Sequence, residues 1–230
     1  GLQWRYNAAP LKIKEMIKNG ELGDVYYVKS QQLRPRRLPA YGVYTSKEQN
    51  GGGVLMDGGP HSIDLPMWLT DNYEVESVRG VTFDKMKNFP EGNDLGPWDP
   101  ENFDVEDTAM AMITMKNGMM IYMETAWATN MIQEAPGVTI SAAGTKAGAD
   151  MVGPTFECSV RTTKIVDGKL KTEIENIPEP VDMNAYDINH WIDAIQNDTD
   201  PAVLPEQAAT VTRVIEAIYE SARTGETIHF

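Results

Sequence analysis

The sequence predicts an α+β domain built on a large, mostly antiparallel open sheet with helices on one face. Helical patterns lie near both ends of the 230-residue chain, and most strand patterns cluster between residues 75 and 175. These patterns do not alternate as they do in a doubly wound parallel sheet, which favours the α+β class. The chain is 41% hydrophobic, enough for a sizeable core. We therefore expect one domain over residues 1–230.

The first third of the chain contains two predicted helices and a strand. Residues 10–19 place apolar side chains on one face, start with a proline suited to a first helical turn and stop at Gly20. Residues 24–34 are rich in β-branched and aromatic side chains and predict a strand with a polar end. An irregular stretch follows, and residues 62–70 then predict the continuation of a second helix that starts within a glycine-rich run.

The middle of the chain predicts strands joined by tight turns. Asn117-Gly118 and Asp167-Gly168 lie between strand patterns, and such pairs are strong hairpin signals. Residues 84–104 are rich in turn-forming residues and predict a loop. The predicted strands are residues 75–83, 105–115, 119–127, 138–143, 156–161, 164–166 and 170–175.

The first hairpin carries apolar residues on both faces of its strands. Six of them are methionines: Met110, Met112, Met115, Met119, Met120 and Met123. A strand that is apolar on both faces requires cover on both, so helices should cover one side of the sheet and something else the other. The second cover is either more of the core or another subunit, and the pattern leaves both open.

Two helices are predicted at the end of the chain, over residues 184–197 and 206–224. The second has a regular apolar face and ends at Gly225. His190 is interpreted as a packing residue beside Trp191, and His229 as part of a frayed terminus.

The run Gly51-Gly-Gly-Val-Leu-Met-Asp-Gly-Gly-Pro-His-Ser-Ile-Asp64 is the strongest functional signal. On a helix, Asp57, His61 and Asp64 would fall at i, i+4 and i+7 and share one face. Histidine exchanges protons near neutral pH, and a carboxylate one turn away can stabilise its cation. The glycines would let the backbone approach a ligand. Two other interpretations are open: the three side chains could bind a divalent metal, and Asp64 could bond to nearby backbone.

Charge and composition exclude several classes of protein. The net charge of −14 argues against nucleic-acid binding. No apolar window is long enough for a membrane span, and no signal-peptide pattern is present. A single cysteine, Cys158, excludes an internal disulfide and, without an export signal, predicts a cytoplasmic location. The basic residues Arg34, Arg36 and Arg37 form either a solvated loop or a contact for an anionic or polyhydroxylated ligand.

These motifs, in this order, resemble the C-terminal domain of the glucose–fructose oxidoreductase, inositol dehydrogenase and rhizopine catabolism (Gfo/Idh/MocA) family. The resemblance rests on the glycine run, on Arg5-Tyr6-Asn7 ahead of the first helix, and on Val214-Ile-Glu-Ala-Ile-Tyr-Glu-Ser-Ala-Arg-Thr-Gly225 near the end. It covers nearly the whole chain. It implies a substrate-binding and oligomerisation domain that follows an NAD(P)-binding Rossmann domain, here absent.

The resemblance also implies the role of each candidate residue. His61 would be the general base that takes a hydroxyl proton from a sugar or polyol, with Asp57 orienting it. Gln32, Arg34 and Trp127 would face the substrate, and Arg5 and Tyr6 would lie close to the cofactor. No metal is implied, and assembly would be a homo-oligomer through the sheet face.

The sequence departs from the family at the cofactor. It has neither the Gly-x-Gly-x-x-Gly turn that cradles a dinucleotide nor the family's Glu-Lys-Pro motif. We therefore expect NAD or NADP to act in a longer parent protein and this chain to bind none by itself. A non-enzymatic binding or assembly module that keeps the family's fold is the alternative function.

Overall fold

One sheet organises the protein. The computed structural model describes residues 1–131, 137–152, 159–177 and 182–230. Among these residues nine strands pair in the order β8-β7-β6-β5-β1-β4-β3-β2-β9. Strands β1 and β4 are parallel and every other pair is antiparallel. The predicted α+β class with a mostly antiparallel sheet is confirmed.

The elements in chain order are η1 (Gln3–Tyr6), α1 (Ala8–Lys18), β1 (Val25–Leu33), α2 (Lys47–Asn50), α3 (Val54–Asp57), α4 (Gly59–Leu69), β2 (Val75–Phe83), η2 (Pro100–Asn102), β3 (Thr108–Met115), β4 (Met120–Ala126), β5 (Thr139–Gly144), β6 (Ala147–Val152), β7 (Ser159–Val166), β8 (Lys169–Asn176), α5 (Met183–Asn197), α6 (Pro205–Thr224) and β9 (Ile228–His229).

Several elements differ from the sequence-based expectation. The strands predicted over 156–161 and 164–166 form the single strand β7, and residues 156–158 lie outside the described residues. Strands β6 and β9 were not predicted. His229 was expected in a frayed terminus, and this was wrong: it pairs with Ser77 of β2, because the edge of β2 offers the hydrogen-bonding groups that a two-residue strand needs.

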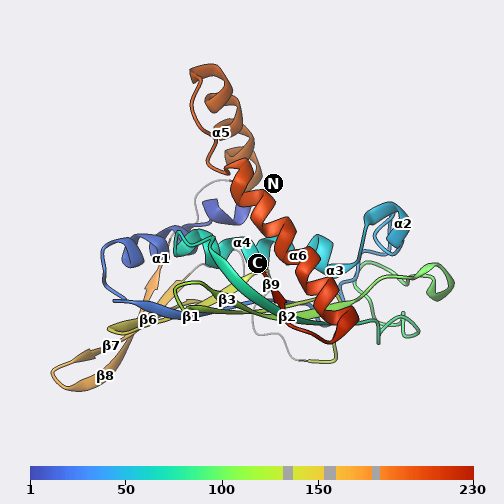
Figure 1. Ribbon diagram of the computed structural model, residues 1–230, viewed down its shortest axis with the longest axis horizontal. Helices are drawn as coiled ribbons and strands as arrows, with labels where there is room; N and C mark the ends of the chain where they lie inside the picture. Colours follow the sequence, from blue (N-terminus) through green and yellow to red (C-terminus); the bar gives the residue numbers. More distant parts are fainter. Residues whose placement is uncertain (132–136, 153–158, 178–181) are drawn as a thin grey trace.

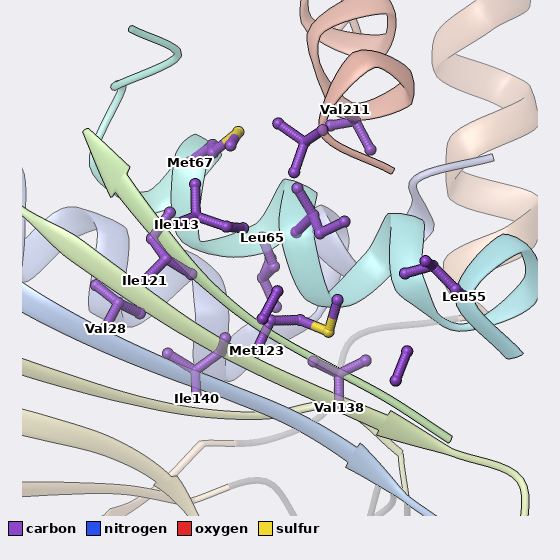
Figure 2. Packing of buried hydrophobic residues seen from close by; sticks show 14 of the residues in the cluster. Val28, Leu55, Leu65, Met67, Ile113, Ile121, Met123, Val138, Ile140 and Val211 are labelled. Carbon is purple, nitrogen blue, oxygen red and sulfur yellow. The ribbon is translucent and has the colours of Figure 1, made fainter. Parts of the chain in front are cut away.

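Helices α1, α4 and α6 cover one face of the sheet, whereas the opposite face is bare of helices in the described part of the chain (Figure 1). Figure 2 shows Leu65 and Met67 of α4 above Ile121 and Met123 of β4, with Val211 of α6 on the other side of the helix. Helix α4 therefore lies between the sheet and the start of α6, whereas further along α6 packs directly on β2. The apolar residues of α4 are buried on both sides, which explains why its sequence shows little amphipathic contrast.

The methionines of the β3–β4 hairpin divide between the two faces of the sheet. Met115, Met119 and Met123 are buried in the core. On the bare face Met112 is 47% exposed, although it lies on an interior strand between Arg79 and Tyr122. The hairpin thus contributes to the core and to an uncovered surface.

Helix α5 projects away from the sheet (Figure 1). Its base contacts η1, where His190 stacks on Tyr6 with ring centroids 5.5 Å apart and lies 4.7 Å from the ring of Tyr186. Its apolar side chains Ile188, Trp191, Ile192 and Ile195 are exposed. No helix among the described residues is both long and apolar enough to cross a bilayer.

The buried side chain of Arg5 joins segments that are distant in the sequence. Its guanidinium donates to both carboxylate oxygens of Asp64 in α4, at 2.8 and 2.5 Å. It also donates to the Tyr73 hydroxyl, the Ala202 carbonyl and Gln207 Oε1 of α6. The interpretation of Asp64 as a backbone-bonding residue was therefore wrong, because Arg5 supplies a stronger, charged donor at the same buried position.

We predict that Arg5→Met destabilises the chain by about 3–5 kcal/mol, because it leaves the Asp64 carboxylate buried without its counter-charge. Urea unfolding of the variant measures this loss. The double variant Arg5→Met/Asp64→Leu should recover part of it, since no charge then remains buried. A single variant as stable as the wild type would show that the ion pair does not hold these segments together.

Candidate active site

The glycine run is packed against the protein itself. Gly51 ends α2 with φ +81°, a conformation that favours glycine. A Cβ on Gly52 would overlap the Tyr219 hydroxyl, and one on Gly53 would overlap the backbone carbonyl of Glu106. The close approach permitted by these two glycines is to Tyr219 and Glu106, whereas the sequence had suggested an approach to a ligand.

Asp57 lies at the end of α3, where three segments meet. Gly58 has φ −89° and ψ −28°, so the chain passes almost helically from α3 into α4 and the one-turn spacing from Asp57 to His61 is kept. The Trp127 indole N–H donates to Asp57 Oδ2 over 2.7 Å. Arg34 Nη1 lies 3.9 Å from the same oxygen. The structure therefore brings four of the predicted site residues together.

His61 is half-buried beside Asp57. Burial lowers its pKa below the ordinary value of 6.5, and the Asp57 carboxylate opposes this shift by raising it. At neutral pH the imidazole is therefore uncharged and able to accept a proton. Its Nδ1 atom is buried and has no hydrogen-bond partner among the described residues.

Buried polar atoms surround the junction of α3 and α4. Gln32 Oε1 of β1 and Thr125 Oγ1 of β4 face Gly58 so closely that a Cβ there would overlap the Gln32 oxygen. The hydroxyls of Ser30 and Ser62 are also buried, and none of these four oxygens has a hydrogen-bond partner in the described part of the protein. Buried polar groups are normally hydrogen-bonded, so this concentration sets the region apart from the apolar core of Figure 2. Gln32, predicted to face substrate, has its amide oxygen in this buried layer.

Two tyrosines that the sequence did not single out extend the site toward solvent. Tyr44 packs edge-on against Trp127 with ring centroids 6.2 Å apart, and Tyr41 packs edge-on against Tyr44 at 5.6 Å. Tyr41 is exposed and Trp127 is fully buried. The three rings therefore form an aromatic wall from the partly buried Trp127–Asp57 hydrogen bond to the surface. These tyrosines lie in an irregular stretch with no periodicity that could have predicted their position.

The basic cluster divides between two roles. Arg34 is partly buried beside Asp57, and burial lowers the pKa of its guanidinium while Asp57 opposes that shift. Arg36 instead donates to the Phe89 carbonyl and to Asn130 Oδ1. The third residue, Arg37, is exposed.

Three predicted residues lie outside this cluster. Asp64 of α4 and Arg5 form a buried ion pair with each other. Tyr6 belongs to the aromatic group with Tyr186 and His190, and burial together with Asp187 raises its pKa to about 12. The cofactor role of Arg5 and Tyr6 stays a prediction. Within the described residues no group of three His, Cys, Asp or Glu side chains is arranged to hold a metal ion, and both carboxylate oxygens of Asp64 accept from Arg5.

A cleft of about 680 Å³ lies behind the glycine run. Gly52, Glu106 and Tyr219 line it, together with charged residues of α6. Neither Asp57 nor His61 contributes to its lining, so it is separate from the site described above.

The chain resembles known proteins along its length. Residues 14–230 match the sequence model of an oxidoreductase family, C-terminal alpha/beta domain (GFO_IDH_MocA_C). A D-glucoside 3-dehydrogenase of Escherichia coli K12 is 30% identical over 214 residues, which are 93% of this chain and 59% of that protein. The chain therefore spans about three fifths of this relative.

Solved structures agree on the fold. An aldose-aldose oxidoreductase from Caulobacter crescentus, crystallised with glycerol, superimposes with a TM-score of 0.78 at 23% identity, over 100% of this chain and 63% of that one. A levoglucosan dehydrogenase in complex with NADH gives a TM-score of 0.77 at 18% identity, over 99% of this chain and 64% of that one. At these identities the likeness establishes the fold alone.

The depressed pKa of His61 predicts a pH dependence of stability. The unfolded chain binds a proton at this histidine below about pH 6.5, whereas the folded chain resists it. The free energy of unfolding should therefore fall on acidification, by up to about 1.4 kcal/mol per pH unit between 6.5 and the folded-state pKa. Urea unfolding of the wild type and of His61→Gln between pH 7.5 and 5 measures the difference. If both lose the same stability, the folded-state pKa of His61 is not depressed.

Proposed function

Since the chain belongs to the oxidoreductase family whose C-terminal alpha/beta domain matches residues 14–230, we propose that it is the substrate-binding and catalytic half of an NAD(P)-dependent dehydrogenase. Its substrate would be a sugar, a polyol or a related derivative that is oxidised at a hydroxyl. The observation that carries the proposal is the neutral, half-buried His61 beside a carboxylate that Trp127 holds by a hydrogen bond. That is the arrangement a general base requires.

In this proposal His61 accepts the proton of the reacting hydroxyl. The uncharged imidazole can take the proton, and the Asp57 carboxylate stabilises the imidazolium that forms. The Trp127 indole fixes the direction of the Asp57 oxygen, and Arg34 adds a positive charge near the same atom. The negative charge of Asp57 thereby stabilises the proton on His61 until the proton is released.

The substrate class follows from the lining of the site. Arg34 offers a polar contact for hydroxyl groups, and the rings of Tyr41 and Tyr44 offer flat apolar surfaces. Gln32 and Trp127, which were also predicted to face the substrate, are buried. Sites for small polar molecules commonly combine such surfaces with a few placed polar groups. The name of the D-glucoside 3-dehydrogenase relative supports a glycoside or sugar among the candidates.

The dinucleotide itself does not fit a glycine-rich cradle in this chain. The space beside Gly52 and Gly53 is taken by Tyr219 and Glu106, so the run cannot enclose a phosphate. When bound, a nicotinamide cofactor would supply the hydride acceptor. We place its binding surface in a Rossmann domain of a longer parent protein, with Arg5 and Tyr6 near it. The levoglucosan dehydrogenase that forms a complex with NADH supports a nicotinamide cofactor. A cytoplasmic location completes the proposal, supported by the single cysteine, Cys158.

We also propose a homo-oligomer through the bare face of the sheet. This face has exposed apolar side chains toward both ends of the sheet, Val81 and Met112 on β2 and β3 and Ile165 and Leu170 on β7 and β8. Their ladder partners place them on the side opposite α4. Exposed apolar groups on a sheet face without helices mark an interaction site, and a second copy of the same face carries the same groups.

For the reaction, we predict that His61→Ala in the longer parent protein lowers turnover by roughly two to four powers of ten, the usual contribution of a positioned base. Oxidation of D-glucosides and polyols with NAD⁺ or NADP⁺ provides the assay. The affinity for cofactor should be unchanged, and the control His229→Ala, in β9, should keep wild-type turnover. Near-normal turnover by His61→Ala would refute the role of His61. A wild-type parent that binds sugars without oxidising any would support the binding module instead.

For assembly, we predict that Met112→Lys shifts the chain from a dimer or larger oligomer to a monomer, because it places a charge within the exposed apolar group on β2 and β3. Light scattering after size-exclusion chromatography measures the mass. Leu11→Lys is the matched control, since Leu11 is an exposed apolar residue of α1 on the other side of the sheet. A monomeric wild type would contradict the proposal.

A further inference from the structure

We propose that Glu106 is a positioning residue that fixes Asp57, and through it His61, by clamping the glycine run to α6. The inference rests on the proposed function only where it calls Asp57 and His61 catalytic. The clamp is a set of hydrogen bonds within the chain, and it can be tested without any substrate.

The contacts of Glu106 converge on the start of α3. Its carboxylate oxygen Oε1 accepts from the backbone N–H groups of Gly53 and Leu55, at 3.0 and 2.9 Å. Its own carbonyl accepts from the N–H of Val54 at 3.1 Å. Glu106 is only 9% exposed, so these hydrogen bonds replace most of the contact of its carboxylate with water. Hydrogen bonds to a buried carboxylate are among the stronger ones in proteins.

Helix α3 is held by the packing of Val54 and Leu55 in the core and by the hydrogen bonds at its start. It is a single turn of four residues, too short to be stable alone, and Asp57 is its last residue. The three N–H groups at its start bond to Glu106, two of them to its carboxylate, so this side chain helps to set the direction of the turn. A shift of the turn would move Asp57 directly.

The neighbouring residue completes the arrangement from the other side. The Asp107 carbonyl accepts from the backbone N–H of Trp127 at 2.9 Å. Trp127 in turn donates its indole N–H to Asp57. Two adjacent residues thus hold both partners of the Trp127–Asp57 hydrogen bond, one by a side chain and one by the backbone.

Tyr219 connects this clamp to the C-terminal helix. Its hydroxyl donates to Glu106 Oε1 at 2.9 Å, and burial, followed by the Glu106 charge, raises its pKa so that it stays a donor. Gly52 leaves the room for this hydroxyl. The position of the catalytic segment is therefore tied to α6, which packs against the sheet at β2.

The influence of Glu106 on His61 runs through geometry. The charged groups that shift the pKa of His61 are Asp57, Arg34 and the chain N-terminus. Glu106 is not among them. A change of His61 on removal of Glu106 would therefore report a movement of Asp57.

The test uses NMR of the 230-residue chain with labelled histidine and tryptophan rings. Two signals are followed: the titration of the His61 imidazole and the resonance of the Trp127 indole N–H, identified with Trp127→Phe. In Glu106→Ala we expect the pKa of His61 to fall toward its value in Asp57→Asn, because the raising effect of Asp57 is lost. The indole resonance should move as its acceptor leaves. Glu106→Gln keeps a carbonyl oxygen and should retain most of the wild-type behaviour. Glu101→Ala, an exposed acidic residue of η2, should retain all of it.

A double-mutant cycle separates positioning from direct charge effects. In the Asp57→Asn background, Glu106→Ala should cause no further shift of the His61 pKa. An equal shift with and without Asp57 would overturn the proposal, and so would wild-type signals in Glu106→Ala. If Glu106→Ala does not fold, Glu106→Gln/Tyr219→Phe removes the charge and one donor at constant volume. That variant should show the same shifts at smaller size, and wild-type signals in it would equally refute the clamp. None of these outcomes depends on turnover.

Discussion

The buried guanidinium of Arg5 is the interaction on which the arrangement of the helices depends. A charge out of water must be neutralised and hydrogen-bonded in full, because its desolvation costs several kcal/mol. Arg5 meets this demand only when η1, α4, Tyr73 and the connection between α5 and α6 are all in place. These segments are therefore coupled, and the orientation of α4 follows from the coupling.

The site lies between two buried carboxylates that act on neighbouring helices. Asp64 of α4 forms a buried ion pair with Arg5 of η1. The carboxylate of Glu106 accepts from backbone N–H groups at the start of α3. Asp57, Gly58 and His61 lie between these two points. Leu65 and Met67 of α4 pack against apolar side chains of the sheet (Figure 2). A proton-transferring pair supported from both ends has little freedom to move, as a site built for one geometry requires.

Local patterns predicted the elements that carry their own signals. Strand β2 and helix α6 match the prediction to within a residue, and the Asn117-Gly118 turn closes the β3–β4 hairpin as expected. Helices α2 and α3 are single turns, and β9 has two residues, so none is long enough for a periodic pattern. Such elements form because a neighbour offers a hydrogen-bond partner. That information does not reside in their own residues.

The spacing of Asp57 and His61, and the chemistry that this pair favours, were determined by the sequence alone. A one-turn separation is a local property that survives the break at Gly58. Only the tertiary structure decided the rest. Trp127, seventy positions away in the chain, bonds to Asp57, whereas Asp64, at the predicted helical spacing, turns to Arg5 instead. Glu106 and Tyr219 occupy the space that the glycines leave open. The physical reason is that a buried polar group bonds to whichever partner the fold brings beside it, and those partners come from distant parts of the chain.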